Sequence, residues 1–335
     1  MSSTPAMAKT NPKGTANKVN KRGINIIPQT LHIGAEISNV DLKRPLTKVK
    51  RQEIYDALLT WKVVFFRDQN LDHEEHVALA RQFGRPTIGH AVFGHLKGFP
   101  EIYSVAKNRT ANSHRETRLN TPWTGWHTDI TAAVNPPMAS ILRAVNIPPY
   151  GGDTMWTNLT AAYNNLSAPI KSFVDDLRCI HSFAPPAGAE RVKSYDESVK
   201  NRTLKSEHPL VTVHPDTGER QLFISPLFVK TIVGLSPRES QQILEMLWEH
   251  LVRPEFTVRF KWNCGDIAMW DNRATAHLAP NDIFSTDHDR QLYRVTLVGE
   301  VPLGIDGKLS TSLEGEAILS AEEELASRPT PIDVS

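Results

Sequence analysis

The sequence predicts a mainly β fold with flanking helices, built as an antiparallel double-sheet barrel. Short β-type segments dominate the second half of the chain, among them 267–270, which follows Gly265 and Asp266, and 292–298, which alternates as a strand does. No Gly-rich phosphate loop follows any of these segments, which argues against a dinucleotide-binding parallel sheet.

Capping residues predict the flanking helices. Thr47 can cap a helix that ends before the strand-like run at 62–67. Asp72 can cap a second helix, which we expect to stop at Gly84 in a left-handed C-terminal position. The run Ser-Pro-Arg-Glu at 236–239 combines an N-cap, a first-turn proline and a capping-box glutamate, and so begins a third helix.

Length and composition exclude several classes of protein. The 335 residues allow two ordinary domains or one large β-rich enzyme domain. No run approaches the roughly 18 apolar residues of a membrane span, and the start lacks a signal-peptide pattern, so we expect a soluble, cytoplasmic protein. Cys179 and Cys264 are too few for a disulfide framework or a cysteine-based metal site, so a metal would have to bind histidine and carboxylate side chains.

The charge is balanced in total but not along the chain. There are 38 Lys and Arg against 37 Asp and Glu, yet residues 1–22 hold five basic residues and no acid, while 314–335 hold six acids and one arginine. We expect a disordered basic tail at 1–22, a folded body at 23–304 and a solvated acidic tail at 305–335. The net charge of +1 does not favour nucleic acid; the alternatives for the basic end are binding to an acidic partner and a targeting role.

A metal site without cysteine is best sought as His-x-Asp or His-x-Glu, because residues i and i+2 of a strand share a face. The pair at 73–75 lies in the first turn of a predicted helix, where i and i+2 point apart, and the pair at 214–216 lies in a predicted hairpin turn; both are interpreted as structural. His127 and Asp129 differ, because their aromatic and β-branched segment has no turn residue after Gly125. Both can therefore project from one strand.

A facial triad needs a third ligand from a distant strand, and His277 is the best candidate, although a structural histidine is the alternative. In the strand that follows, Arg290 and Arg294 share parity and point to one face of an otherwise apolar ribbon. An arginine fork there suits a carboxylate or a sulfate, which it binds with two parallel hydrogen bonds. An ordinary salt bridge to a neighbouring acid is the other interpretation.

Several motifs occur in collinear order between residues 23 and 304. They are Gly-Ala-Glu-Ile at 34–37 with Val-Asp-Leu at 40–42, Val-Val-Phe-Phe-Arg-Asp-Gln at 63–69, Trp-His-Thr-Asp at 126–129, Gly-Gly-Asp-Thr at 151–154, His-Pro-Leu-Val at 208–211 with His-Pro at 214–215, and Trp-Asp-Asn-Arg at 270–273 with His277. This set resembles the TauD/TfdA family of Fe(II)/2-oxoglutarate-dependent dioxygenases. The resemblance implies one domain at 23–304 whose core is a double-stranded β-helix, or jelly roll.

Within that family the chain is most similar to the alkylsulfatase dioxygenases. The motifs are Ser-Ile-Leu-Arg-Ala-Val at 140–145, Trp-Asp-Asn-Arg-Ala-Thr at 270–275 and Arg-Val-Thr-Leu-Val-Gly-Glu-Val-Pro at 294–302. The resemblance therefore implies oxidation of a small anionic substrate, in particular an alkyl sulfate ester that is cleaved to aldehyde and sulfate. It also implies a homo-oligomer, with no nucleic acid or membrane as partner.

Matching positions assign the cofactors. The resemblance implies that His127, Asp129 and His277 bind Fe(2+), and that Thr154 and Arg290 hold the distal carboxylate of the co-substrate 2-oxoglutarate. O2 is consumed, and succinate and CO2 are the co-products. The carboxylate of Asp129 favours oxygen insertion, because halogenating relatives lack it.

Matching positions also suggest how the substrate binds. Arg294 would lie near 2-oxoglutarate and the sulfo group of the substrate, His90 matches the histidine that binds the substrate anion, and Ile130 matches a residue that lines the pocket. Phe183 and Phe228 are further candidates for an apolar lining, with ordinary core packing as the alternative. The alternative substrates are a sulfonate such as taurine, an aryloxyalkanoate or another carboxylate metabolite, and the alternative to an enzyme is a metal-binding barrel without turnover.

Two segments depart from the family pattern. The loop at 278–289 is about two residues longer, which would shift a pocket wall. The segment at 104–126 is also extended, and its charges belong either to a substrate lid or to an exposed loop. Those residues are Arg109, His114, Arg115 and Arg118.

Overall fold

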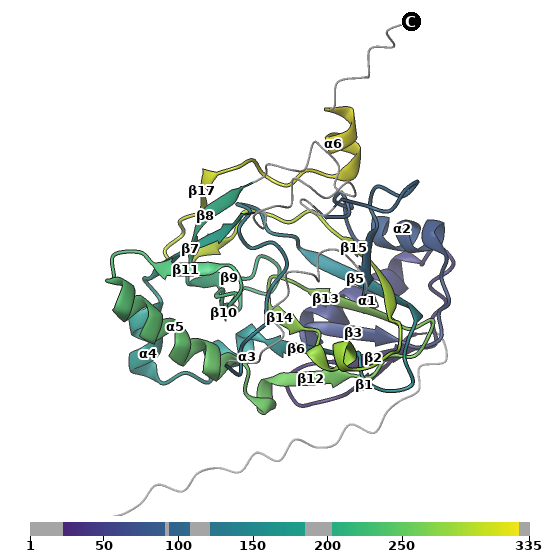
Figure 1. Cartoon of the computed structure of the whole chain (residues 1–335), viewed down its shortest axis with the longest axis horizontal. Helices are drawn as coiled ribbons and strands as arrows, with labels where there is room; N and C mark the ends of the chain where they lie inside the picture. The colour runs from purple at the N-terminus through teal and green to yellow at the C-terminus, as the bar shows by residue number, and fades with distance from the viewer. Residues whose placement is uncertain (1–22, 91–93, 108–120, 185–202, 328–335) are drawn as a thin grey trace, which may run out of the picture.

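The computed structural model describes residues 23–90, 94–107, 121–184 and 203–327 (Figure 1). The strands are β1 (Asn25–Pro28), β2 (Ala35–Ser38), β3 (Val63–Phe66), β4 (Tyr103–Ala106), β5 (Ala139–Asn146), β6 (Thr154–Asn158), β7 (Arg178–Phe183), β8 (Leu204–Pro209), β9 (Val211–Val213), β10 (Arg220–Leu222), β11 (Val229–Ile232), β12 (Thr257–Phe260), β13 (Ile267–Asp271), β14 (Thr275–Leu278), β15 (Gln291–Thr296), β16 (Leu303–Gly304) and β17 (Thr311–Glu314). The helices are α1 (Lys48–Trp61), α2 (His73–Arg81), α3 (Leu159–Asn164), α4 (Ala168–Val174), α5 (Pro237–Leu251) and α6 (Ala321–Ala326). Within these ranges no helix combines the length and apolar character that crossing a membrane requires.

The largest sheet has its strands in the order β1-β2-β3-β13-β5-β15-β4 and is antiparallel except between β2 and β3. Side chains that alternate along each strand give it two buried faces. On β13, Ile267 and Met269 share a cluster with Leu58 of α1. Ala268 and Trp270, which alternate with them, belong to a different cluster. Helices therefore cover one face, and the other is left for a second sheet.

That second sheet is β12-β6-β14, also antiparallel. Aromatic rings fill the space between the two sheets. Phe65 of β3 stacks on Phe260 of β12 with ring centroids 4.1 Å apart, and Trp156 of β6 meets Trp270 of β13 at 5.6 Å. Such rings bury large apolar areas and fix the separation of the sheets. Two facing antiparallel sheets with helices outside them confirm the predicted mainly β fold.

Two further sheets, β11-β7-β8-β17 and β10-β9-β16, lie beside α3, α4 and α5 (Figure 1). The predicted hairpin joins β9 to β10, and its turn is closed by a hydrogen bond from the Gly218 amide to the His214 carbonyl, 2.9 Å. The predicted capping box begins α5, because the Ser236 hydroxyl and the Glu239 carboxylate each accept from the other's backbone amide. Leu247 of α5 is then fully buried against these strands.

The other two helices begin where their caps predict. Thr47 accepts from the Lys50 amide at the start of α1, and Asp72 caps α2. The predicted end of α2 is wrong, because the helix stops at Arg81 and Gly84 does not have a left-handed conformation. A Cβ at Gly84 would lie 3.3 Å from the Leu297 side chain, so this glycine permits a close approach to Leu297, the residue that follows β15.

The ends of the chain differ in how far they can be described. The basic segment 1–22 and the four basic residues expected in the extended loop lie outside the described residues. Most residues from 314 to 327 are exposed, as expected of a tail, but β17 pairs with β8, and Ser320, Ala321 and Glu324 are buried. The prediction of a solvated tail is therefore wrong for this part, because a capping box at Ser320 begins helix α6 and the segment packs on the barrel.

Candidate metal centre

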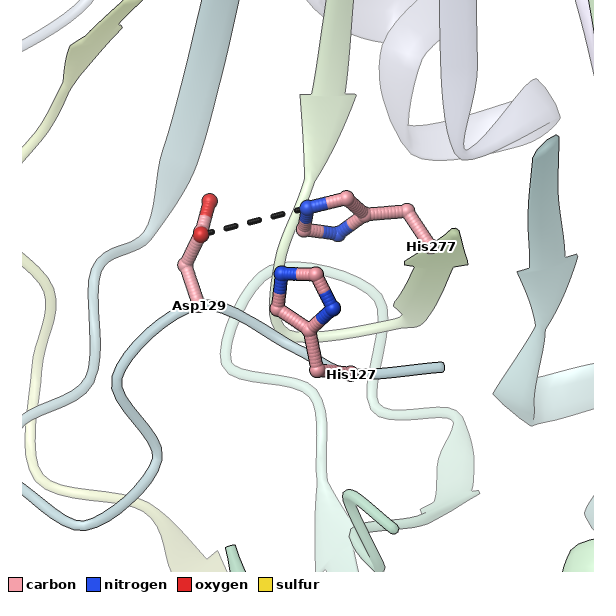
Figure 2. Close-up of side chains that lie close together, drawn as sticks. All are labelled: His127, Asp129 and His277. Carbon is pink, nitrogen blue, oxygen red and sulfur yellow. Dashed lines mark ion pairs between the residues drawn. The ribbon is translucent and has the colours of Figure 1, made fainter. Parts of the chain in front are cut away.

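Three side chains from two distant parts of the sequence converge on one point (Figure 2). One ligand atom each from His127, Asp129 and His277 lie within 4.8 Å of one another, and Nε2 of His277 is 3.9 Å from Oδ1 of Asp129. Asp129 and His277 are buried, whereas His127 is half-buried. The structure therefore brings together the three residues that the sequence singles out.

The backbone around these residues explains how they meet. His277 lies on β14, and it exchanges two backbone hydrogen bonds with His127, at 2.9 and 2.7 Å. The expectation that His127 and Asp129 project from one strand is wrong, because this single bridge is the only ladder contact there and a turn begins at Asp129. The turn aims the Asp129 carboxylate toward the two rings (Figure 2).

Ile130 carries the strain of that turn. Its φ is 44°, in the left-handed region that a β-branched residue rarely adopts, at a cost of about 1–3 kcal/mol. Neighbouring hydrogen bonds hold it: the Thr128 hydroxyl donates to the Thr275 carbonyl at 2.7 Å, and the Thr128 amide donates to the Ser225 hydroxyl at 3.1 Å. The surrounding fold thus stabilises a conformation that places Asp129.

The two histidines have the protonation that a metal ligand needs. Nδ1 of His127 lies 3.0 Å from the Gly125 carbonyl, which can only accept, so Nδ1 carries the proton and Nε2 the lone pair. Burial, and next the neighbouring His127, hold the pKa of His277 well below its usual value, so its ring is neutral. Nδ1 of His277 is buried with no hydrogen-bond partner among the described residues. Two imidazoles beside a carboxylate fit a divalent transition metal.

Asp129 is held as a carboxylate. Burial acts to raise its pKa, but the positive charge of Arg294 and the interactions with His277 and His127 outweigh burial, and the pKa lies below its usual range. The site therefore offers a charged oxygen ligand at neutral pH.

Each Asp129 oxygen has its own hydrogen-bond donor. The Ser140 hydroxyl donates to Oδ2 at 2.8 Å, and Nη1 of Arg294 donates to Oδ1 at 2.5 Å. The Asn272 side-chain amide donates to the Ser140 hydroxyl at 2.9 Å and so fixes its direction. Both oxygens are thus held by the protein, and Oδ1 is the one that faces Nε2 of His277, 3.9 Å away.

Thr154 and Arg290 form a second polar group. Nε of Arg290 donates to the Gly152 carbonyl at 2.7 Å, and Nη2 lies 3.3 Å from the Thr154 hydroxyl. The same hydroxyl accepts from the Trp262 indole at 3.0 Å. Arg290 is 6% exposed and Thr154 is 3% exposed. A buried guanidinium beside a hydroxyl suits one end of a dicarboxylate.

The Gly-Gly-Asp-Thr motif has a steric reason at Gly152. Its φ is 70°, and a Cβ there would lie 2.9 Å from Cδ of Arg290. Only glycine lets the backbone carbonyl approach the guanidinium this closely.

Strand register places the two groups in one space. Thr154 and Trp156 share a face of β6, and Trp156 lies directly opposite His277 of β14. Arg294 lies opposite Leu142, whose side chain belongs to the cluster between the sheets. Thr154 and His277 therefore face Arg294 and Arg290 across the gap between the sheets.

His90, the expected anion ligand, lies beside Tyr103. It is half-buried, and its ring is 4.9 Å from the ring of Tyr103. The guanidinium carbon of Arg294 lies 5.4 Å from the centroid of the same Tyr103 ring. Tyr103 thus contacts both proposed anion-binding side chains.

The three apolar candidates share one cluster. Ile130, Phe183 and Phe228 pack together, the two phenylalanine rings at 5.9 Å, and Ile318 belongs to the same cluster. Phe228 is buried, whereas Ile130 and Phe183 are only half-buried. This apolar surface begins one residue from Asp129.

Sequence reasoning missed the supporting residues Ser140, Asn272, Tyr103 and Trp262. Ser140 and Asn272 stand in motifs quoted for the family, where a polar residue in a buried strand was the available signal. Tyr103 and Trp262 carry no local signal, because their roles depend on contacts with residues far along the chain.

A cavity of about 360 Å³ lies apart from this group of residues. Its walls include His214, Gln221, Asn272 and Arg273, and none of the three converging residues lines it. Asn272 stands between the two, since it also hydrogen-bonds Ser140.

One buried and one half-buried histidine with a buried carboxylate, placed between the sheets of an antiparallel barrel, define a site of the non-haem Fe(II) oxygenase class. Comparison with known proteins agrees. The family model described as "Taurine catabolism dioxygenase TauD, TfdA family" matches residues 25–296, and the chain belongs to this family. Both the expected family and its alpha-ketoglutarate-dependent dioxygenase activity are thereby confirmed.

Individual relatives span most of the chain. An alpha-ketoglutarate-dependent sulfate ester dioxygenase of Pseudomonas putida is 38% identical over 86% of this chain and 93% of its own. An alkylsulfatase of Acinetobacter baylyi is 39% identical over 88% and 90%. A crystal structure of a taurine dioxygenase from Burkholderia xenovorans is 58% identical, with a TM-score of 0.78, over 88% of this chain and 95% of its own. These likenesses confirm the jelly-roll core.

A more distant solved structure contains a metal ion. It is AAD-2 in complex with Mn(II) and N-oxalylglycine, 28% identical with a TM-score of 0.65 over 83% of this chain and 98% of its own.

Proposed function

We propose that the enzyme oxidises an alkyl sulfate ester at the carbon that bears the ester oxygen, and so releases an aldehyde and sulfate. The observation that carries the proposal is the position of Arg294. Its buried guanidinium contacts Asp129, while a half-buried apolar surface begins at the neighbouring Ile130. The Arg294 cation and the apolar surface at Ile130 both lie beside the Asp129 carboxylate, and this pair of features matches a substrate with a sulfate head and an alkyl chain. Two relatives, 38% and 39% identical, are named for sulfate esters.

His127, Asp129 and His277 would hold Fe(2+). The fit rests on the donor set, on the lone pair that His127 directs from Nε2, and on Nε2 of His277, which lies 3.9 Å from Oδ1 of Asp129. When bound, the metal supplies activation of O2 coupled to oxidative decarboxylation of 2-oxoglutarate to succinate and CO2.

Arg290 and Thr154 would bind the distal carboxylate of 2-oxoglutarate. The Gly152 carbonyl fixes the guanidinium through Nε and so places it beside the Thr154 hydroxyl. The Thr154 hydroxyl, already accepting from Trp262, can donate its own proton to the same carboxylate.

The substrate's sulfate would be bound by Arg294 and His90. Arg294 offsets the charge of Asp129 and faces the same space, and Tyr103 supports both side chains. Holding the head group there leaves the adjacent C–H toward the metal side of Asp129. One oxygen atom inserted into that C–H bond gives a hydroxylated ester. Its C–O(sulfate) bond then breaks, the electron pair leaves with sulfate, and the hydroxyl proton passes to solvent as the aldehyde forms.

A sulfonate is the second candidate, because the 58% identical solved structure is described as a taurine dioxygenase. A sulfonate would use the same cations but would release sulfite instead of sulfate. An aryloxyalkanoate would release a phenol. The apolar surface beside Asp129 favours the ester, since a taurine chain is short and ends in a cation.

The test is reconstitution with Fe(2+) and 2-oxoglutarate under anaerobic conditions, followed by O2 and a panel of octyl sulfate, taurine and an aryloxy acid. We expect octyl sulfate to stimulate succinate formation with one sulfate released per succinate. Sulfite from taurine without sulfate from the ester would assign the second candidate. Absence of stimulation by every compound would contradict the proposed substrate and both alternatives, and would direct the search to another small anion.

Three properties rest on the sequence and family resemblance alone and remain proposals. They are a cytoplasmic location, assembly into a homo-oligomer, and the absence of nucleic acid and membrane among its partners.

A further inference from the structure

The C-terminal segment 316–323 crosses from β17 to α6 over the top of the molecule (Figure 1). It lies beyond residue 296, where the match to the family model ends. Its contacts connect two parts of the chain that carry proposed substrate-binding residues.

The first attachment is to the segment that follows Asp129. The Ile318 amide donates to Oδ1 of Asn135 at 2.7 Å, and the Asn135 side-chain amide donates back to the Ile318 carbonyl at 3.0 Å. Asn135 is itself buried. These two reciprocal hydrogen bonds fix the backbone position of Ile318 relative to the turn at Ile130.

The second attachment is to the segment that leads to His90. Ser320 forms a bridge with Thr87, and the Ala321 amide donates to the Pro86 carbonyl at 2.8 Å. An ion pair at 2.6 Å between Arg85 and Glu323 adds to it at the surface. One short segment therefore holds both the apolar and the anion-binding side of the proposed site.

Ile318 contributes a side chain as well as a backbone. It packs in the cluster of Ile130, Phe183 and Phe228. Ile130, Phe183 and Ile318 are each half-buried, so they present apolar surface that the fold leaves partly open. A hydrocarbon chain is the ligand chemistry that such a surface favours.

We propose that Ile318 forms the outer wall of the alkyl-chain pocket and sets the length of chain that the enzyme accepts. This inference rests on the proposed function, because it assumes a sulfate ester held with its head group near Arg294. The chain then runs from Asp129 over Ile130 and reaches Ile318 at its distal end. Short esters end before Ile318, and long ones contact it.

The test compares kcat/KM for butyl, hexyl, octyl and decyl sulfate in the wild-type chain and four variants. Ile318→Trp should lower kcat/KM for decyl sulfate by about tenfold or more and change butyl sulfate by less than about twofold. Ile318→Ala should lower kcat/KM for octyl sulfate by about tenfold, again with little effect on butyl sulfate. Leu319→Trp and Leu319→Ala are matched controls, because Leu319 is the next residue and is 38% exposed. They should keep the wild-type profile.

Two measurements keep the outcomes separate. The KM for 2-oxoglutarate should be the same in Ile318→Trp and wild type. The affinity for Mn(2+), measured in the absence of the ester, should also be the same. Both results would show that the variant is folded around an intact centre. A wild-type chain that turns over none of the esters overturns the proposed substrate and this inference with it. The inference alone is overturned if the wild-type chain turns over the esters and the Ile318 variants either leave kcat/KM unchanged or change it by the same factor for every chain length.

Discussion

Replacing Arg290 by alanine isolates the binding of 2-oxoglutarate from the rest of the reaction. Arg290 is 6% exposed, it is held by the Gly152 carbonyl at 2.7 Å, and it shares the Thr154 hydroxyl at 3.3 Å. A carboxylate bound by such a fork loses two charge-assisted hydrogen bonds, at a cost of about 2–4 kcal/mol. The KM for 2-oxoglutarate should therefore rise by about 30- to 1,000-fold.

The assay measures succinate formation, first with 2-oxoglutarate varied at saturating ester and then with the ester varied at saturating 2-oxoglutarate. The KM for the ester should change by less than about threefold, because uniform binding of the co-substrate alone has been lost. Thr154→Val is the graded comparison: it removes one neutral hydrogen bond and should raise the KM for 2-oxoglutarate by about two- to tenfold. Equal increases in both KM values for Arg290→Ala would refute the assignment of this arginine to the co-substrate.

Three further predictions address other parts of the site. His127→Ala and Asp129→Ala should abolish turnover and weaken Mn(2+) binding by at least about tenfold with an unchanged circular dichroism spectrum, and normal turnover in either would contradict the ligand set. Gly152→Ala should raise the KM for 2-oxoglutarate, because its Cβ would lie 2.9 Å from Arg290; a wild-type KM would show that the loop yields. Urea unfolding should show a lower free energy of unfolding at pH 5 than at pH 7.5. Burial lowers the pKa of His76 to about 3, so between about pH 3 and about pH 6.5 only the unfolded chain binds a proton on this imidazole. Equal stability at the two pH values would refute this.

Local signals in the sequence predict local structure well. Thr47, Asp72 and the residues at 236–239 begin helices as their caps indicate, because a capping side chain contacts backbone only a few residues away. The end of α2 is not predicted, since Gly84 is required for packing against Leu297, a contact between distant segments.

The metal site is predicted for a partly different reason from the one the structure gives. The pattern of His127 and Asp129 suggests one continuous strand, but the structure has a single bridge and then a strained turn at Ile130. The side chains still converge, because backbone hydrogen bonds pair His277 with His127, which lies far from it in the sequence. Residue identity therefore indicates the chemistry, while the backbone that delivers it is set by long-range pairing.

The C-terminal segment was beyond sequence reasoning. Its composition is that of a tail, and only the capping box at Ser320 indicates order. The hydrogen bonds of Ile318 with Asn135 join residues 183 positions apart, and the sequence around neither residue predicts them. Such contacts become visible only once the barrel is formed.

The central claim is that this site couples 2-oxoglutarate to cleavage of a sulfate ester. The most direct measurement is the yield of sulfate, octanal and succinate from octyl sulfate in the Fe(2+)-reconstituted enzyme during one exposure to O2. We expect the three products in equal amounts, and none of them when O2 is withheld. Succinate without sulfate or octanal would contradict the claim and direct the search to another small anion.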